Sequence, residues 1–407
     1  MTSLDKMLHL ANESRFDTLG PLGSEGACDM AKVRALGEGS KHDICVSSAS
    51  SRTPKGTQRL GDVASGGVCH SFSHDGRCVS LFKTLYTNSC VHECGYCPNA
   101  STCVSHSGDY AYTPEELARL TVQLYRGNYI EGLFLSSGIG SDVDDIMEGM
   151  IESVRILRTR YAFQGYVHLK VLPGASKEHI KQCLELADRV SVNIETVSPS
   201  RMDELSTSKD YVNDILRRQR YICTLQRHIP LPAGQTTQMI VGGAHERDDE
   251  IFSASIKEYR RYSVRRVYYS AFTPVEGTLL EREKMQPRWR EHRLYQLDWL
   301  YRVYKLPLEE LFAIFDDEGA LTNRDPKFEL ARLVLDRPVD PNVATYEDLL
   351  HVPGIGPITA SRIIRARESQ QIVSRRQLHL LGVRMKHASP FLLINGWGEC
   401  TLDRWTS

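Results

Sequence analysis

The feature that most constrains the fold is a regular alternation of short apolar runs with helix-like stretches between residues 79 and 274. Six runs have the length and composition of strands, at 78–88, 131–138, 165–174, 190–195, 236–243 and 265–274. Parallel strands need crossover connections of about a dozen residues or more, and these are right-handed. The alternation therefore predicts an α/β fold, either a barrel or a partial (β/α)6 barrel, with its chemistry at the carboxyl ends of the strands.

Helix start and stop signals support these boundaries. Thr113 is a predicted N-cap, followed by Pro114 at the first helical position and by Glu116, which completes a capping box. Gly127 is placed to end the same helix. Ser176 is the predicted N-cap of a later helix. These signals favour helices between the strands rather than long loops.

Composition narrows the class of protein. A chain of 407 residues suggests two or three domains, and its formal net charge of −1 means that any affinity for nucleic acid must come from a local patch. No apolar run reaches 18 residues and the N-terminus lacks an apolar signal region, so we expect no membrane segment. The chain has eleven cysteines and no secretory signal, which argues against a disulfide framework. We therefore expect the protein to be located in the reducing cytoplasm.

Changes in composition and in hydrophobic pattern along the chain predict four regions. They are an N-terminal helix with a Gly/Ser-rich, mobile segment at 1–66, the barrel at 67–283, a helical extension and bridge at 284–340, and a small all-α module at 341–395. The N-terminal helix is expected over 4–17. In the extension, Tyr295 and Trp299 are four residues apart, which favours packing over stacking on a nucleobase.

The stretch "LYTNSCVHECGYCPNA" holds Cys90, Cys94 and Cys97 in C-x3-C-x2-C spacing, directly after the first predicted strand. Thiolates are soft ligands that suit zinc or iron–sulfur clusters. A structural zinc ion takes four ligands, whereas a 4Fe–4S cluster held by three cysteines leaves one iron open to an amine and a carboxylate. Further cysteines that are candidates for a fourth ligand lie nearby: Cys69, Cys78 and Cys103. From spacing alone, both metals stay open.

This spacing, with Tyr96 just before the last cysteine, resembles the signature of the radical S-adenosylmethionine (radical SAM) superfamily. The resemblance implies a 4Fe–4S cluster on Cys90, Cys94 and Cys97 that reduces bound S-adenosylmethionine. Cleavage then gives methionine and a 5′-deoxyadenosyl radical, which abstracts a substrate hydrogen atom. It also implies an electron donor such as flavodoxin or ferredoxin.

A polar pair points into the predicted barrel. Asn193 and Glu195 alternate with apolar neighbours in "VSVNIE", so both side chains face the interior. Polar groups in a barrel interior are costly unless they bind something, and the alternative is a structural hydrogen-bond network. The superfamily resemblance assigns cofactor contacts to Tyr96, Ser136, Ser137, Gly138, Asn193, Glu195, Gly242 and Gly243.

Other strand-end residues are weaker candidates. Relatives often have Gly-Gly-Glu where this chain has Ser136-Ser137-Gly138, so hydroxyls and main-chain carbonyls would replace the missing glutamate. Gly242 and Gly243 would let adenine approach the main chain. Lys170, Tyr268 and Ser270 are candidates for contact with substrate or cofactor, without assigned roles.

The C-terminal stretch "TYEDLLHVPGIGPITASRIIRAR" has a capping box at Thr345 and Asp348, then a glycine turn, then Pro357 in the first turn of a second helix. It resembles the helix-hairpin-helix motif of DNA repair and recombination proteins. Main-chain N–H groups freed by the glycines would grip one phosphate at a helix N-terminus. The residues that we expect to bind DNA are Gly354, Ile355, Gly356, Arg362 and Arg365.

Local charge supports this interpretation. Seven basic residues between 351 and 391 face a single acidic one, Glu368: Arg362, Arg365, Arg367, Arg375, Arg376, Arg384 and Lys386. The segment "RRQLHLLGVRMKHASPFLLING" looks like a degenerate second copy, with Gly382 and Val383 in the hairpin position. An ordinary helical hairpin that mediates protein contacts is the alternative.

With both motifs on one chain, residues 60–395 resemble a bacterial family of radical SAM proteins assigned to DNA modification or repair. Blocks such as "GYVHLKVLPGAS", "PAGQTTQMIVG" and "REHRLYQLDWLYRVY" carry this resemblance. It implies DNA as a partner and a uracil-DNA-glycosylase-like protein as a possible second one. Two alternatives remain at this point: radical chemistry on RNA, and a non-catalytic DNA-binding protein stabilised by zinc.

Overall fold

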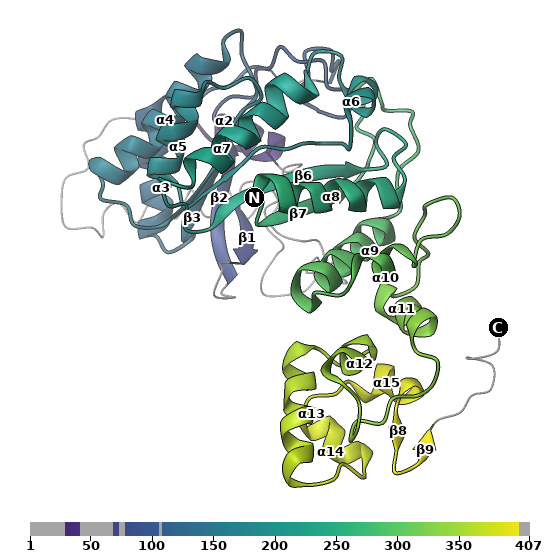
Figure 1. Cartoon of the computed structure of the whole chain (residues 1–407). Coiled ribbons are helices and arrows are strands. Elements are labelled where there is room, and N and C mark those ends of the chain that lie inside the picture. The colour runs from purple at the N-terminus through teal and green to yellow at the C-terminus, as the bar shows by residue number, and fades with distance from the viewer. Residues whose placement is uncertain (1–28, 41–67, 73–77, 106–107, 399–407) are drawn as a thin grey trace, which may run out of the picture. The chain divides into compact units, whose positions relative to one another are not determined.

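The computed structural model describes residues 29–40, 68–72, 78–105 and 108–398 (Figure 1). The helix predicted over 4–17 lies outside these residues. The chain divides into two compact units. The first contains the described residues up to Glu246 together with Ser253–Gln286, and the second contains Arg247–Phe252 together with the described residues from Pro287. Of the helices described, none has the length and apolar character needed to cross a membrane.

Within the described residues, the first unit is built on a sheet of seven strands in sequential order. The strands are β1 (Val68–Phe72), β2 (Cys78–Leu85), β3 (Gly132–Ser136), β4 (Tyr166–Lys170), β5 (Arg189–Ser191), β6 (Gly234–Val241) and β7 (Arg266–Ala271). Neighbours from β2 to β7 pair in parallel. The α/β partial barrel predicted from the alternation is thereby confirmed. β1, which was not predicted, pairs antiparallel with β2 at the edge.

Helices between the strands form an outer layer in which α3, α4, α5 and α7 pack each against the next (Figure 1). The helical segments of this unit are α2 (Met30–Gly39), α3 (Pro114–Arg126), α4 (Val143–Thr159), α5 (Lys177–Leu186), α6 (Pro199–Leu205), a π-helical turn (Tyr211–Leu216) and α7 (Arg217–Leu225). α8 (Asp248–Tyr262) connects β6 to β7. The capping box of Thr113 and Glu116 and the N-cap at Ser176 are both confirmed.

Helix α2 contradicts part of the prediction that residues 20–66 are mobile and without structure. Asp29 caps it, accepting hydrogen bonds from two main-chain N–H groups. Val33 and Leu36 are fully buried, and Lys32 forms a 2.9 Å ion pair with Glu116 on α3. The helix was missed because its glycines and Gly/Ser-rich surroundings hide two apolar positions that matter only once the sheet is present.

Glu258 on α8 gives the first unit a predictable response to pH. Its carboxylate is buried and accepts a 2.7 Å hydrogen bond from the side-chain amide of Gln219 on α7. Burial raises the pKa of Glu258 to about 8. The folded state therefore holds a proton that the unfolded chain releases near its ordinary pKa of 4.5. This stabilisation is complete below that value and is lost as the pH rises towards 8.

We expect the free energy of unfolding to fall between about pH 5 and about pH 8, by up to about 1.4 kcal/mol per pH unit from this one group. In Glu258→Gln, which cannot ionise, that part of the fall should disappear. Urea unfolding at several pH values measures it. Equal pH dependence in both proteins would show that Glu258 is ionised in the folded state.

The second unit is helical apart from a small terminal hairpin. Its segments are α9 (Arg288–Trp299), a π-helical turn (Leu300–Tyr304), α10 (Leu308–Phe312), α11 (Pro326–Val334), α12 (Tyr346–His351), α13 (Pro357–Ser369), α14 (Arg375–Leu380), α15 (Met385–Ala388), a 3-10 turn (Ser389–Phe391), β8 (Leu393–Ile394) and β9 (Trp397–Gly398). Tyr295 is buried, in line with the packing role predicted for it, whereas Trp299 is half exposed. The capping box of Thr345 and Asp348 begins α12 as predicted.

Candidate functional site

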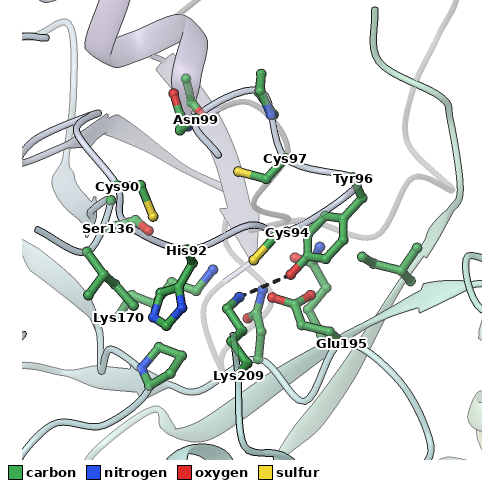
Figure 2. A pocket seen from close by; sticks show the side chains of 18 of the residues that line it. Cys90, His92, Cys94, Tyr96, Cys97, Asn99, Ser136, Lys170, Glu195 and Lys209 are labelled. Atoms are coloured by element: carbon green, nitrogen blue, oxygen red, sulfur yellow. Dashed lines mark hydrogen bonds between the residues drawn. The ribbon is translucent and has the colours of Figure 1, made fainter. Parts of the chain in front are cut away.

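A cavity lies at the carboxyl edge of the parallel sheet, with a volume of about 1150 Å³ counted out to its mouth (Figure 2). All six parallel strands contribute to its lining, either from the strand or from the loop that follows it. In strand order, contributions include Cys90, Cys94, Cys97, Ser136, Ser137, Gly138, Lys170, Asn193, Glu195, Gln238 and Ser270.

The three clustered cysteines all line this cavity as free thiols. Cys94 is buried, while Cys90 and Cys97 are half-buried, and Figure 2 shows all three among the side chains that line the cavity. Burial, and then the neighbouring Cys94, raise the pKa of Cys97 to about 12. Thiolates here therefore need a compensating positive charge, which a metal centre supplies. The donor set fits an iron–sulfur cluster.

Cys103, the nearest candidate for a fourth ligand, does not join them. Cys103 is buried, but it does not line the cavity. In the part of the chain that the structure describes, no group of three or more His, Cys, Asp or Glu residues is arranged to hold a single metal ion. The fourth ligand that a structural zinc site requires is thus not supplied by Cys103 at the cavity.

The turn after β3 fixes the position of the cysteine loop. The Gly138 N–H donates to the Thr87 carbonyl at 2.7 Å, and the Ser137 hydroxyl accepts from the Thr87 N–H at 3.2 Å. A Cβ atom on Gly138 would lie 2.4 Å from the Ser89 carbonyl oxygen. Ser137 and Gly138 therefore hold the main chain that leads to Cys90, and only glycine permits this approach.

Gly138→Ala should push the turn and the cysteine loop apart. We expect S-adenosylmethionine binding to weaken by about tenfold or more, as with other changes to residues that support metal ligands. Gly140→Ala is the matched control, because its nearest neighbour is a flexible side-chain atom of Ile146 at 3.4 Å. Equilibrium binding of S-adenosylmethionine to the iron-loaded protein is measured for both variants. Equal affinities for the two variants would contradict this role of Gly138.

Asn193 and Glu195 both line the cavity, on the chain that continues beyond β5. Glu195 has a left-handed main chain, with φ of 60°, and β6 holds it on both sides. Its N–H donates to the Gln238 carbonyl at 3.0 Å, and its carbonyl accepts from the Ile240 N–H at 2.7 Å. A bulky residue held in this conformation stores strain, which is characteristic of functional sites.

Glu195 meets Tyr96 and Lys209 at the cavity wall (Figure 2). The Lys209 ammonium donates to the Tyr96 hydroxyl at 3.2 Å, and that hydroxyl also hydrogen-bonds Glu195. Burial, Glu195 and Cys94 raise the pKa of Tyr96, so its phenol stays protonated. For Lys209, burial lowers the pKa while Cys94 and Glu195 raise it by more, so the ammonium is retained.

Several predicted contacts lie away from the cavity. Gly242 and Gly243 are buried at the end of β6 but are not part of its lining, so the predicted adenine contact gains no support there. Tyr268 lies deeper in the barrel, where its hydroxyl accepts from Arg189. Sequence reasoning missed Lys209 and Gln238. The period-two rule that found Asn193 also applies to Gln238, whereas no local signal marks Lys209.

The C-terminal hairpin has the predicted form. Gly354 has φ of 86°, and a Cβ atom there would lie 2.6 Å from the Arg384 carbonyl oxygen. Gly356 is extended and caps α13, and Pro357 occupies the first turn of that helix. A glycine turn before a helix N-terminus provides a concave group of main-chain N–H donors that suits a phosphate.

A second hairpin lies beside the first. Gly382 has φ of 101° between α14 and α15, so it repeats the geometry of Gly354. The Arg384 N–H donates to the Gly354 carbonyl at 3.0 Å, and the Thr359 hydroxyl donates to the Gly382 carbonyl at 3.4 Å. Val383 is buried at the place that corresponds to Ile355. The suspected second copy is therefore present in the structure.

Ile355 packs into the hairpin through its side chain, and the contact with DNA predicted for this residue stays a prediction. Its side chain is fully buried and its N–H donates to the Val352 carbonyl. Its carbonyl accepts from the buried ammonium of Lys327, which lies 4.4 Å from the centre of the Tyr304 ring. Burial lowers the pKa of Lys327 to about 7. The turn of the hairpin is thus hydrogen-bonded to a buried amine on α11.

The basic residues divide into two groups. Arg367 donates to the carbonyls of Pro341 and Ala344. It therefore has a structural role, unlike the other basic residues of the cluster. Exposed members of the cluster are Arg362, Arg365, Arg375, Arg376, Arg384 and Lys386. The predicted DNA contacts Arg362 and Arg365 thus lie on the surface of α13.

Comparison with known families gives two matches. Residues 84–254 match the model of the family described as the radical SAM superfamily. Residues 334–382 match the model described as a helix-hairpin-helix motif. The first match covers the parallel strands from the end of β2 to β6, and the second covers α12, α13 and α14. No curated protein matches the chain.

Among solved structures, HydG, a maturase of the FeFe-hydrogenase, is 12% identical with a TM-score of 0.41, over 54% of this chain and 48% of HydG. Methylornithine synthase (PylB) is 15% identical with a TM-score of 0.42, over 52% of this chain and 60% of PylB. The radical S-adenosylmethionine methyltransferase TsrM from Kitasatospora setae is 9% identical with a TM-score of 0.38, over 59% of this chain and 47% of TsrM. In each case, the match spans less than two thirds of the other protein.

Radical SAM proteins use a 4Fe–4S cluster and S-adenosylmethionine. The parallel strands, the cysteine loop after the first of them and the family match all concern the same part of the chain. The two glycine hairpins and the second family match likewise coincide. The chain therefore carries a radical SAM domain over residues 84–254 and a helix-hairpin-helix motif over residues 334–382.

Proposed function

We propose that this protein is a radical SAM enzyme that modifies or repairs DNA. The observation that carries the proposal is the set of three thiols at the carboxyl edge of the sheet, on a chain that also holds two glycine hairpins. Cys90, Cys94 and Cys97 would be the cluster ligands. Three protein ligands leave a coordination position free for S-adenosylmethionine.

The cavity offers contacts for each part of the cofactor. Asn193 and Glu195 face it with an amide and a carboxylate, which suit ribose hydroxyls or the methionine amine. Ser136 lines it at the end of β3, where a main-chain carbonyl or hydroxyl takes the place of a glutamate. When bound, the cluster and S-adenosylmethionine supply a radical that abstracts a hydrogen atom. The protein binds and orients the cofactor and the substrate, and it excludes water.

The two hairpins support DNA as the substrate. Their glycines expose main-chain N–H groups at neighbouring turns, and six exposed basic residues lie on the same helices and turns. Phosphate contacts of this kind position a nucleic acid without reading its bases. Base selection would then belong to the barrel cavity, and a base in a duplex must leave the stack to reach it.

Partners follow from the chemistry and from the family resemblance. Reductive cleavage of S-adenosylmethionine needs a one-electron donor, such as flavodoxin or ferredoxin. A uracil-DNA-glycosylase-like protein is the further partner that we propose on the resemblance.

The test is the yield of 5′-deoxyadenosine from the anaerobically purified, reduced protein. We expect turnover to rise when DNA is added, and comparison of duplex DNA, single-stranded DNA and RNA identifies the substrate class. Stimulation by RNA alone would replace DNA with RNA in the proposal. A protein that carries stoichiometric zinc and no iron or sulfide would overturn the enzymatic proposal.

A further inference from the structure

The segment Leu205–Lys209, which begins at the last residue of α6, runs along the cysteine loop and forms hydrogen bonds with it. The Gly95 N–H donates to the Leu205 carbonyl at 2.8 Å. The Glu93 N–H donates to the Ser208 hydroxyl at 3.0 Å. Nδ1 of His92 is 2.9 Å from the same hydroxyl. This segment lies far from the cysteines in sequence, and no local motif marks it.

Two side chains of the segment reach the sulfur of Cys94. The Ser206 hydroxyl is 3.4 Å from Sγ of Cys94 and is almost fully buried. The Lys209 ammonium interacts electrostatically with Cys94, and Figure 2 shows it near Cys94 and joined by a hydrogen bond to the Tyr96 hydroxyl. Cys97, by comparison, accepts from the main-chain N–H of Asn99. Of these two cysteines, Cys94 is thus the one with which the Lys209 cation interacts more strongly.

This arrangement suits a metal-bound thiolate better than a free thiol. A thiolate only accepts hydrogen bonds, so the Ser206 hydroxyl would donate to it once the thiol proton is lost. The Lys209 ammonium adds a positive charge near the sulfur in either case. Hydrogen bonds to the sulfurs and the net local charge are among the factors that set the reduction potential of an iron–sulfur cluster.

We propose that Ser206 and Lys209 are positioning residues that act through Cys94 to make one-electron reduction of the cluster easier. The reduced cluster carries one more negative charge, so donors and a cation at a ligand sulfur stabilise it more than the oxidised cluster. The electron comes from the external one-electron donor. This inference rests on the proposed function, because it requires a cluster on Cys94.

The test is a redox titration of the cluster by electron paramagnetic resonance, in the full-length, anaerobically reconstituted protein with dithionite as reductant. We expect Lys209→Met to make reduction about tenfold less favourable, which equals about 59 mV for one electron. Ser206→Ala should act in the same direction with a smaller effect. Lys209→Arg, which keeps the charge and a donor, should restore most of the difference.

Thr207→Val is the matched control. Its hydroxyl donates to the Glu93 carboxylate at 3.4 Å and Thr207 is exposed, so it belongs to the same segment without a contact to Cys94. The reduction potential of the cluster in Thr207→Val should equal that of the wild type. If Lys209→Met fails to hold a cluster, the reduction potential of Ser206→Ala tests the inference instead. This variant removes a single hydroxyl and should keep the cluster.

Unchanged potentials in Lys209→Met and Ser206→Ala, at normal iron and sulfide content, would overturn the inference and leave the proposed function intact. In that case the segment only fastens the loop. A wild-type protein without iron and sulfide would contradict the proposed function itself. The two failures are therefore distinguishable.

Discussion

Cys94→Ala is expected to abolish both cluster binding and S-adenosylmethionine cleavage. Cys94 is buried at the cavity and sits between two other cavity-lining thiols in the sequence. A cluster with only three protein ligands has none to spare, so the loss should be complete rather than partial. Iron and sulfide content and the yield of 5′-deoxyadenosine measure the two effects.

Cys223→Ala is the control for this experiment. Cys223 is a half-buried free thiol on α7, away from the cavity lining, and its sulfur donates to the Ser263 hydroxyl at 3.8 Å. It should keep the full cluster and activity. Retention of both in Cys94→Ala would show that the ligand assignment is incorrect. Cys90→Ala and Cys97→Ala should behave as Cys94→Ala does.

Gly354→Ala is expected to weaken DNA binding by about tenfold or more while leaving cleavage of S-adenosylmethionine without DNA unchanged. Alanine at φ of 86° is strained by roughly 1–2 kcal/mol. Its Cβ atom would also lie 2.6 Å from the Arg384 carbonyl oxygen, so the two hairpins would have to separate. Tenfold in affinity corresponds to about 1.4 kcal/mol, which these two effects together can supply.

Gly396→Ala separates strain from crowding. Gly396 also has a positive φ, of 76°, but a Cβ atom there would meet no atom within 4 Å. Both variants belong to the second unit, but Gly396 lies in the turn between β8 and β9, whereas Gly354 lies in the turn between α12 and α13. Fluorescence anisotropy with labelled DNA at fixed salt compares them. Equal affinities for Gly354→Ala and the wild type would place the DNA site elsewhere.

The barrel was predictable because its signals are local and repeated. Each predicted strand overlaps an observed one, and capping residues such as Thr113 and Ser176 act within their own helix. Helix α2 was not predictable in the same way. Its Val33 and Leu36 become informative only when β2 is there to pack against, and a run of glycine and serine surrounds them.

The candidate site was predictable only as far as spacing and strand periodicity reach. C-x3-C-x2-C spacing and the alternation around Asn193 led to residues that the structure brings to one cavity. Lys209 comes to Cys94 through a long-range turn after α6, which no short window of sequence contains. The DNA contact of Ile355 stays a prediction from its motif position, whereas the burial of its side chain depends on packing that spacing does not show.

The central claim is that the radical generated in the barrel acts on DNA. Transfer of deuterium tests it most directly, because the hydrogen atom abstracted from the substrate becomes part of 5′-deoxyadenosine. With deuterated DNA and the reduced protein, mass spectrometry should find deuterium in 5′-deoxyadenosine, and the transfer should be lost in Gly354→Ala at low DNA concentration. 5′-Deoxyadenosine that forms in the presence of deuterated DNA yet never contains deuterium would contradict the claim.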